Sequence, residues 1–177
     1  MRVIGIDPGL ATVGYGIVEK NGDKYRAMDY GYIETPAGLE LSKRLLDIYY
    51  STKLLIDRFS PDELAIEKLF FCKNIKTALQ VGEARGAILT AAAEKGIAIF
   101  EYTPLQVKQA AAGYGRAGKK QVQQAVCLLL RLMEIPRPDD AADALAIALC
   151  HLQSSRWQRL IEEKAGAKYD FPVSGDR

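Results

Sequence analysis

The chain has 177 residues, of which 49% are hydrophobic and 26% are charged. This length and composition predict one globular domain with a sizeable core, and they argue against a wholly disordered chain or a large two-lobed enzyme. The 24 basic and 22 acidic residues leave a net charge of +2, which does not by itself indicate a nucleic-acid partner.

Three strands joined by short turns are predicted at the start of the chain. These strands cover residues 2–7, 12–20 and 25–34. The first is apolar and stops at Pro8-Gly9, and Asn21-Gly22 separates the second from the third. Because hairpin-like turns connect neighbouring strands, we expect the three strands to be antiparallel.

Helices alternate with short apolar strands in the rest of the chain. The predicted helices cover residues 40–59, 74–95, 104–112, 118–133 and 139–153, and the strands between them cover 63–67 and 97–102. Crossovers through helices favour parallel pairing of the first, fourth and fifth strands. We therefore predict an α/β fold with a mixed five-stranded sheet flanked by helices, formed by residues 1–153, and a polar, flexible tail over residues 154–177.

Two acidic residues end strands that we expect to be parallel neighbours. Asp7 ends the first strand, and Glu67 ends the fourth. Ligands gather beyond the carboxyl ends of parallel strands, so both side chains are candidates for one site. Alternatively, each carboxylate caps a turn, with Lys68 as a partner for Glu67.

Three aspartates lie at the start of the last predicted helix. Asp139 and Asp140 suit the first turn of a helix, where the helix dipole favours negative charge. That explanation does not extend to Asp143, which lies one turn further along in a segment that is otherwise apolar and therefore predicted to be buried. A buried carboxylate needs a cation or strong hydrogen-bond donors.

The acidic residues predict a metal site made of oxygen ligands. Asp7, Glu67, Asp140 and Asp143 form the proposed cluster, which suits two divalent ions such as Mg²⁺, with Mn²⁺ as an alternative, and phosphodiester hydrolysis. The single histidine argues against multi-histidine sites, and three cysteines without a CxxC spacing argue against zinc sites and disulfides. The cysteines and the absence of a signal peptide predict a cytoplasmic protein.

A basic segment lies between residues 102 and 133, where there is no Asp or Glu. Lys108, Arg116, Lys119 and Lys120 in this segment are candidate contacts to DNA phosphates. Lys119, next to the glycine-rich stretch 113–118, is also a candidate for stabilising charge in the transition state. A solvated helix start is the alternative explanation, which stays open for Lys120.

Six short sequence motifs follow one another along residues 2–151. They are GIDPGLATVGYGIV, AIEKLFFCKN, EARGAI, VKQ, GKKQVQ and DDAADALAIA. In this set of motifs the chain closely resembles the RuvC family of bacterial Holliday junction resolvases. The resemblance implies a ribonuclease H-like fold, a homodimer, Mg²⁺-dependent cleavage of four-way DNA junctions, and the branch-migration proteins RuvA and RuvB as partners.

The resemblance also implies roles for individual residues. Asp7, Glu67, Asp140 and Asp143 match the acidic tetrad of the family, whereas Asp139 is an additional acid without a ligand role. Lys119 matches a lysine near the active site, Lys108 matches a second functional lysine, and Phe70 matches an aromatic residue that stacks at the junction. Lys73 and Arg85 are further candidate DNA contacts, and either Phe70 or Phe71 is expected to be exposed.

Three other classes of protein share part of this sequence pattern. A ribonuclease H-like enzyme that cuts RNA in RNA–DNA hybrids would use the same acidic residues. A sugar kinase or actin-like ATPase would share the turn at residues 7–9, but these proteins need two such lobes, and this chain is long enough for only one. A binding-only junction module is disfavoured by the complete acid set. For Ala78, Gly82, Gly86 and Thr90, two roles stay open, which are packing on the sheet and contact across a dimer axis.

Overall fold

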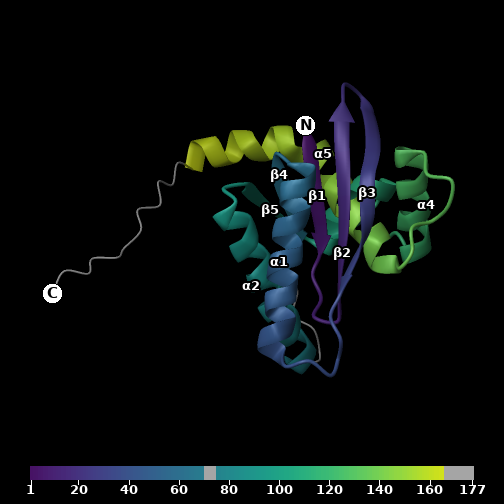
Figure 1. Cartoon of the computed structure of the whole chain (residues 1–177). Coiled ribbons are helices and arrows are strands. Elements are labelled where there is room, and N and C mark those ends of the chain that lie inside the picture. Colours follow the sequence, from purple (N-terminus) through teal and green to yellow (C-terminus); the bar gives the residue numbers. More distant parts are fainter. Residues whose placement is uncertain (70–74, 166–177) are drawn as a thin grey trace.

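A computed structural model describes residues 1–69 and 75–165 of the chain (Figure 1). The elements are, in chain order, β1 (Arg2–Asp7), β2 (Thr12–Asn21), β3 (Lys24–Glu34), α1 (Leu41–Phe59), β4 (Glu63–Glu67), α2 (Ile75–Glu94), β5 (Ala98–Tyr102), α3 (Pro104–Ala112), α4 (Lys119–Leu130) and α5 (Asp139–Ala165). No helix within these described ranges is long and apolar enough to cross a membrane.

The five strands form one sheet in the order β3-β2-β1-β4-β5. β1 pairs with β2, and β2 with β3, in antiparallel fashion, whereas β1 with β4 and β4 with β5 are parallel. The predicted mixed five-stranded sheet is therefore confirmed. The parallel strands β1 and β4 lie at its centre, so their carboxyl ends open at the same edge.

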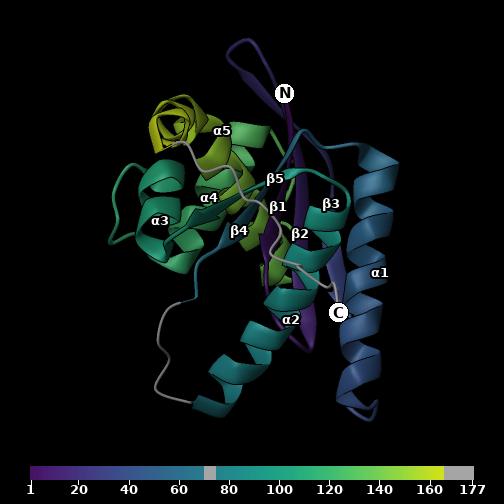
Figure 2. The same cartoon turned by 90° about the vertical axis from the view of Figure 1, so that its left-hand side faces the viewer.

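Helices cover both faces of the sheet. Figure 2 shows α3, α4 and α5 on one side of the strands, with α1 and α2 on the other. The strands alternate accordingly, since Val3 and Ala65 pack in the core beneath α5, and Ile4 and Ile66 pack in the core shared with α1 and α2. Because side chains alternate along a strand, Asp7 and Glu67 lie on the same face as Val3 and Ala65, facing α5.

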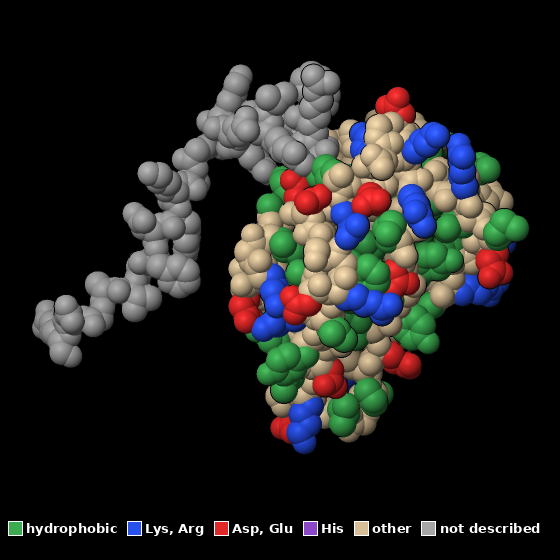
Figure 3. Space-filling model, turned by 45° about the horizontal axis from the view of Figure 1, so that its top comes forward, with side chains coloured by type: hydrophobic (Ala, Val, Ile, Leu, Met, Phe, Trp, Pro, Cys, Tyr) green, Lys and Arg blue, Asp and Glu red, His purple; other side chains and the backbone are tan. Residues whose placement is uncertain are grey.

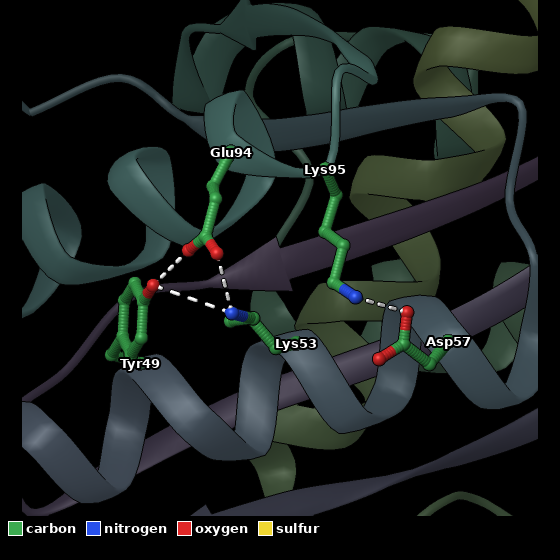
Figure 4. Close-up of polar contacts among 5 residues, drawn as sticks. All are labelled: Tyr49, Lys53, Asp57, Glu94 and Lys95. Carbon is green, nitrogen blue, oxygen red and sulfur yellow. Dashed lines mark hydrogen bonds and ion pairs between the residues drawn. The ribbon is translucent and has the colours of Figure 1, made fainter.

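Polar contacts join α1 to the C-terminal end of α2 (Figure 4). Lys53 forms an ion pair with Glu94 at 2.6 Å, and the hydroxyl of Tyr49 donates to the same carboxylate. Lys95 forms a second ion pair with Asp57 of α1. Exposed pairs of this kind contribute little stability individually, but together they hold the two helices in one relative position.

The single histidine lies in the core rather than at a functional surface. His151 of α5 is fully buried, and its Nδ1 is hydrogen-bonded to the hydroxyl of Tyr102 at 2.7 Å. Its other ring nitrogen contacts the carboxylate of Glu63 on β4. This chain of polar groups connects α5 with two strands and so fixes the helix against the sheet.

Two helix ends differ from the predictions. α4 ends at Leu130 and not near residue 133, because Arg131 adopts a left-handed conformation (φ 54°) whose N–H closes the last turn. α5 continues through Ala165, whereas we predicted its end at residue 153. The segment 154–165 contains no Gly or Pro, and most of its residues favour helices, so nothing in it stops the helix.

Candidate active site

Asp7 and Glu67 meet at the carboxyl ends of the two central parallel strands. Ile6 of β1 is paired with Ile66 of β4, so the following residues, Asp7 and Glu67, lie side by side. Both side chains are partly covered, and both face the layer that contains α5. The strand register therefore brings together two carboxylates that are 60 residues apart in the sequence.

Glycines in the central strands allow α5 to approach this pair closely. Gly14 is the β2 partner of Asp7, and a Cβ atom there would overlap the backbone carbonyl oxygen of Asp140. A Cβ atom at Gly5 would likewise lie only 2.6 Å from the backbone nitrogen of Ala148. The first turn of α5 thus rests directly on the sheet, which carries Asp140 and Asp143 to the strand ends.

A cavity of about 280 Å³ opens where these elements meet. Its polar lining consists of three carboxylates and two ammonium groups, and its apolar lining comes from α3, α4 and α5. The residues that line it are Asp7, Glu67, Pro104, Val107, Lys108, Lys119, Val122, Asp143 and Ile147. Acidic and basic groups therefore converge on one partly apolar hollow.

The carboxylates in this cavity are held in an environment that disfavours their charged forms. Burial, followed by repulsion from Glu67, Asp143 and Asp140, raises the pKa of Asp7 to about 8. Burial, followed by the charge of Asp143, also raises the pKa of Glu67, although Lys108 opposes the shift. Since repulsion between the four acids contributes to these shifts, Asp140 lies within electrostatic reach of the cavity even though it does not line it.

Lys119 lies between two aspartates at the start of α4. Its Nζ is 3.2 Å from an oxygen of Asp139 and 3.2 Å from an oxygen of Asp143. Partial burial alone would lower the pKa of Lys119, but its hydrogen bonds to the two aspartates outweigh that effect and raise it. Burial raises the pKa of Asp143 despite this ion pair, so the lysine balances only part of the negative charge.

Asp139 differs from the other acids because it faces outward. Its side chain is 60% exposed, accepts a hydrogen bond from Gln123 at 3.0 Å, and pairs with Lys119. The hydrogen bonds from Lys119 and Gln123 lower the pKa of Asp139, in contrast to the raised values of its buried neighbours. Asp139 therefore contacts two side chains of α4 from the solvent side.

The donor set fits a hard divalent cation. Asp7, Glu67, Asp140 and Asp143 offer only carboxylate oxygens, the ligands that Mg²⁺ prefers. The raised pKa values of Asp7, Glu67 and Asp143 indicate a local deficit of positive charge. In the described part of the chain, no three acidic, histidine or cysteine side chains are already arranged to hold a metal ion. Asp143 directs an oxygen to Lys119 instead.

The basic candidates lie on both sides of the cavity. Lys108 of α3 lines it, and Arg116, Lys119 and Lys120 are exposed around the start of α4. The face seen in Figure 3 mixes acidic and basic side chains, with basic ones most concentrated at the upper right. A chain with a net charge of +2 can therefore still present a local concentration of basic side chains.

The remaining predicted DNA contacts have different surroundings. Arg85 of α2 is paired with Glu101 of β5, its side chain is only 15% exposed, and its Nε is buried without a hydrogen-bond partner. This placement connects α2 with β5 and leaves little of the Arg85 side chain accessible, and a contact of Arg85 with DNA stays a prediction. Phe70, Phe71 and Lys73 lie outside the described residues.

Sequence reasoning missed the features that depend on packing between elements. It treated Asp139 as an extra acid, because the contact with Lys119 requires α4 to cross the start of α5. It also overlooked Gly5 and Gly14. Their signal is the small size of the residues in contact, since Gly5 faces Ala144 and Ala148, and Gly14 faces the backbone of Asp140, just before the alanine-rich segment 141–148.

Known proteins resemble this chain over most of its length. A sequence model of the family described as "Crossover junction endodeoxyribonuclease RuvC" matches residues 3–151. A protein of that name from Halothermothrix orenii is 57% identical over 159 residues, which are 90% of this chain and 96% of the relative. Another from Thermotoga maritima is 54% identical over 93% of this chain and 98% of the relative.

A solved structure shares the fold as well as the sequence. The RuvC of T. thermophilus in complex with a Holliday junction substrate superimposes with a TM-score of 0.85. It is 40% identical, and the match covers 89% of this chain and 96% of the other.

Proposed function

The chain belongs to the RuvC family of crossover junction endodeoxyribonucleases, and we propose that Asp7, Glu67, Asp140 and Asp143 form the centre at which it hydrolyses DNA. As a member of this family, the protein is an endonuclease that resolves Holliday junctions. The observation that supports our assignment of the centre is the cavity at the strand ends, in which partly buried carboxylates with raised pKa values face Lys108 and Lys119.

The family is metal-dependent, and we propose Mg²⁺ as the ion and the four carboxylates as its ligands, with two ions per site and Mn²⁺ as an alternative. When bound, Mg²⁺ would polarise the scissile phosphodiester and lower the pKa of the attacking water. The protein itself supplies the carboxylate oxygens, the apolar wall formed by Val107, Val122 and Ile147, and the positive charge of the two lysines.

Lys119 is proposed to act on the reacting phosphate. It is the first residue of α4, where unpaired backbone N–H groups and the helix dipole attract anions. Its ammonium group lies at the cavity and is held there by Asp139 and Asp143. A lysine in this position can stabilise the negative charge that grows on the phosphate in the transition state.

The basic residues outside the cavity are proposed to bind the arms of the junction. Arg116 and Lys120 are exposed beside Lys119, so phosphates on both sides of the scissile bond can be contacted from the loop 113–118 and the start of α4. Phe70 and Lys73 stay proposals from the family resemblance, with Phe70 stacking on a base. Arg85 is proposed as a structural residue.

A homodimer is proposed because a four-way junction needs two symmetric cuts. Gly86 and Thr90 of α2 are exposed, and a Cβ atom at Gly86 would meet nothing within 4 Å. The side of α2 that packs in the core carries Ala84 and Ile88 instead, so packing on the sheet does not explain the small residues. A second copy is the proposed occupant of this face, which would place two active sites on opposite strands.

The family resemblance supports further proposals about the setting of the reaction. RuvA and RuvB are proposed partners, the cytoplasm is the proposed location, and residues 1–153 are the proposed nuclease domain. The two alternative enzymes are not supported, because the family match covers residues 3–151 and the junction complex of T. thermophilus has the same fold.

Cleavage of synthetic DNA tests the proposed function. The protein is incubated with a four-way junction and with a linear duplex of the same sequence, with and without Mg²⁺, and the cuts are mapped on each strand. We expect symmetric cuts on two opposing strands of the junction, only with Mg²⁺, and none in the duplex. The Asp7→Asn variant should bind the junction without cutting it, and equal cutting of both substrates, or full activity of that variant, would contradict the proposal.

A further inference from the structure

A second cavity lies next to the acidic centre and has a different character. Its volume is about 320 Å³, within the usual range of ligand pockets, roughly 300–1,000 Å³. It is lined by the turn between β1 and β2, by one side of α2 and by one acid, and these residues are Gly9, Leu10, Ala11, Thr12, Thr77, Gln80, Val81 and Asp140.

The two cavities adjoin the same group of carboxylates. The lining of the second begins at Gly9, two residues after Asp7, and it includes Asp140, whose charge contributes to the raised pKa of Asp7. A DNA strand whose scissile phosphate lies at the carboxylates therefore has to place its neighbouring nucleotides in or beside these hollows.

The lining chemistry distinguishes which part of a nucleotide each cavity can take. The first cavity contains Lys108 and Lys119, which suit phosphate oxygens. The second contains no lysine or arginine, and its one charged residue is Asp140, which repels phosphate. The uncharged polar groups of Thr12, Thr77 and Gln80 suit instead the sugar and base of a nucleotide.

Gln80 is the residue in this lining best equipped to distinguish bases. Its carboxamide carries both a donor and an acceptor and can pair with the edge of a base at two positions. Thr77, Gln80 and Val81 have the spacing of one helix side, so they face the cavity together. This side of α2 differs from the exposed side that carries Leu79 and Gly86.

We propose that this cavity receives the nucleoside adjacent to the scissile phosphate and that Gln80 contacts its base, so that Gln80 contributes to the sequence preference of cleavage. The inference rests on the proposed function, because it takes the four carboxylates as the site of hydrolysis. Its ligand class is a nucleobase with its sugar, held by hydrogen bonds and by the apolar contacts of Leu10 and Val81.

The test uses four-way junctions in which the base pairs around the cut positions are randomised. Cut products from single-turnover reactions are sequenced for the wild-type protein, for Gln80→Ala and for Gln80→Glu. Gln153→Ala is the matched control, since Gln153 is exposed and lies ten residues beyond Asp143 on α5. Thermal melting verifies that each variant is folded.

At one position beside the cut, Gln80→Ala should weaken the base preference roughly 5-fold or more, the usual effect of losing a two-point base contact. Gln80→Glu keeps only acceptors and should shift the preference toward bases that donate at their major-groove edge, which are cytosine and adenine. A base preference that is the same in Gln80→Ala as in the wild type and Gln153→Ala would overturn the inference, as would a wild type without any preference beside the cut. Failure of the wild type to cut junctions at all would instead refute the proposed function.

A fluorescent base provides a readout that does not depend on cleavage. 2-Aminopurine is placed beside the cut position in a junction, which is bound in the presence of a metal chelator. The fluorescence change on binding should be smaller for Gln80→Ala than for the wild type and Gln153→Ala. An identical change for all three proteins would count against a base in this cavity.

Discussion

The ammonium group of Lys119 makes two ion pairs of equal length, with Asp139 on the exposed side and with Asp143 on the cavity side. The two aspartates therefore place one positive charge at the edge of the cavity. A charge held in advance at this point costs little reorganisation when the reacting phosphate becomes more negative.

Replacement of Lys119 by alanine should therefore lower turnover more than affinity. We expect a ~100-fold loss of single-turnover cleavage rate at saturating junction, by comparison with other groups that stabilise transition-state charge. Lys120→Ala is the control, because Lys120 is an exposed neighbour and should affect binding and its salt dependence more than the rate. If Lys119→Ala cuts at the normal rate once saturated, Lys119 is an ordinary phosphate contact.

The raised pKa of Asp7 predicts how the metal-free protein responds to pH. The pKa is 3.8 for a free aspartate and about 8 in the folded protein. Between these values the folded state binds more protons than the unfolded state, so stability falls as pH rises from about 4 to about 8. Asp7→Asn removes the ionisable group and should be more stable than the wild type at pH 8.

Thermal melting in the presence of a chelator measures this effect. We expect Asp7→Asn to melt about 4–8 °C above the wild type at pH 8, corresponding to roughly 2 kcal/mol, with the difference shrinking toward pH 5. Asp23→Asn, at an exposed turn, serves as the control for general charge effects. A difference that is absent at pH 8, or that grows toward pH 5, would contradict a raised pKa at Asp7.

At the scale of elements, the active site depends on how closely α5 approaches the sheet. The alanines of α5 and the glycines of β1 and β2 together remove the side chains that would separate them. Gly14 is central, because it is paired with Asp7 and lies against the backbone of Asp140. A single methyl group at this point would alter the relation between the two acids.

Gly14→Ala should consequently reduce both stability and cleavage. We expect a loss of about 1–3 kcal/mol, which is typical of overpacking, together with a lower cleavage rate at saturating junction. Melting and single-turnover cleavage provide the two measurements. Gly38→Ala is the control, since an added Cβ atom there meets nothing within 4 Å, and equal behaviour of the two variants would argue against close packing at Gly14.

The sequence predicted elements well where one residue pattern dominates. The apolar strands at 2–7 and 63–67 and the turn at Asn21-Gly22 lie as predicted. The prediction for α4 was too long because Leu132 and Met133 continue the apolar pattern past Leu130, and no glycine marks the end at Arg131. Alternation along the strands also put Asp7 and Glu67 at one edge, but contacts such as that of Lys119 with Asp139 depend on helix packing, which a linear pattern does not contain.

At the scale of the whole molecule, α2 has two functional sides. One side packs on the sheet and lines the second cavity, and the other exposes Gly86, Thr90 and the 64% exposed Leu79. If two copies contacted each other through the exposed side of α2, the two α2 helices would fix the relative orientation of the two active sites. Symmetric cleavage would then follow from the symmetry of the dimer.

The variant Gly86→Arg tests this arrangement. The position is open in the single chain, so the fold should be retained, and arginine favours helices more than glycine does. In a dimer contact the long charged side chain should prevent close approach. We expect sedimentation velocity to show that this variant is a monomer, and we expect single nicks in the junction in place of paired cuts. A variant that still forms a dimer would show that the interface lies elsewhere.

The most direct test of the central claim compares two neighbouring aspartates on one helix. Asp143 and Asp139 both lie 3.2 Å from Lys119, but Asp143 lines the cavity and Asp139 faces solvent. Single-turnover cleavage of a saturated four-way junction with Mg²⁺ is measured for Asp143→Asn and Asp139→Asn side by side. The account predicts that Asp143→Asn is nearly inactive while Asp139→Asn retains most of the wild-type rate, and an inactive Asp139→Asn beside an active Asp143→Asn would contradict it.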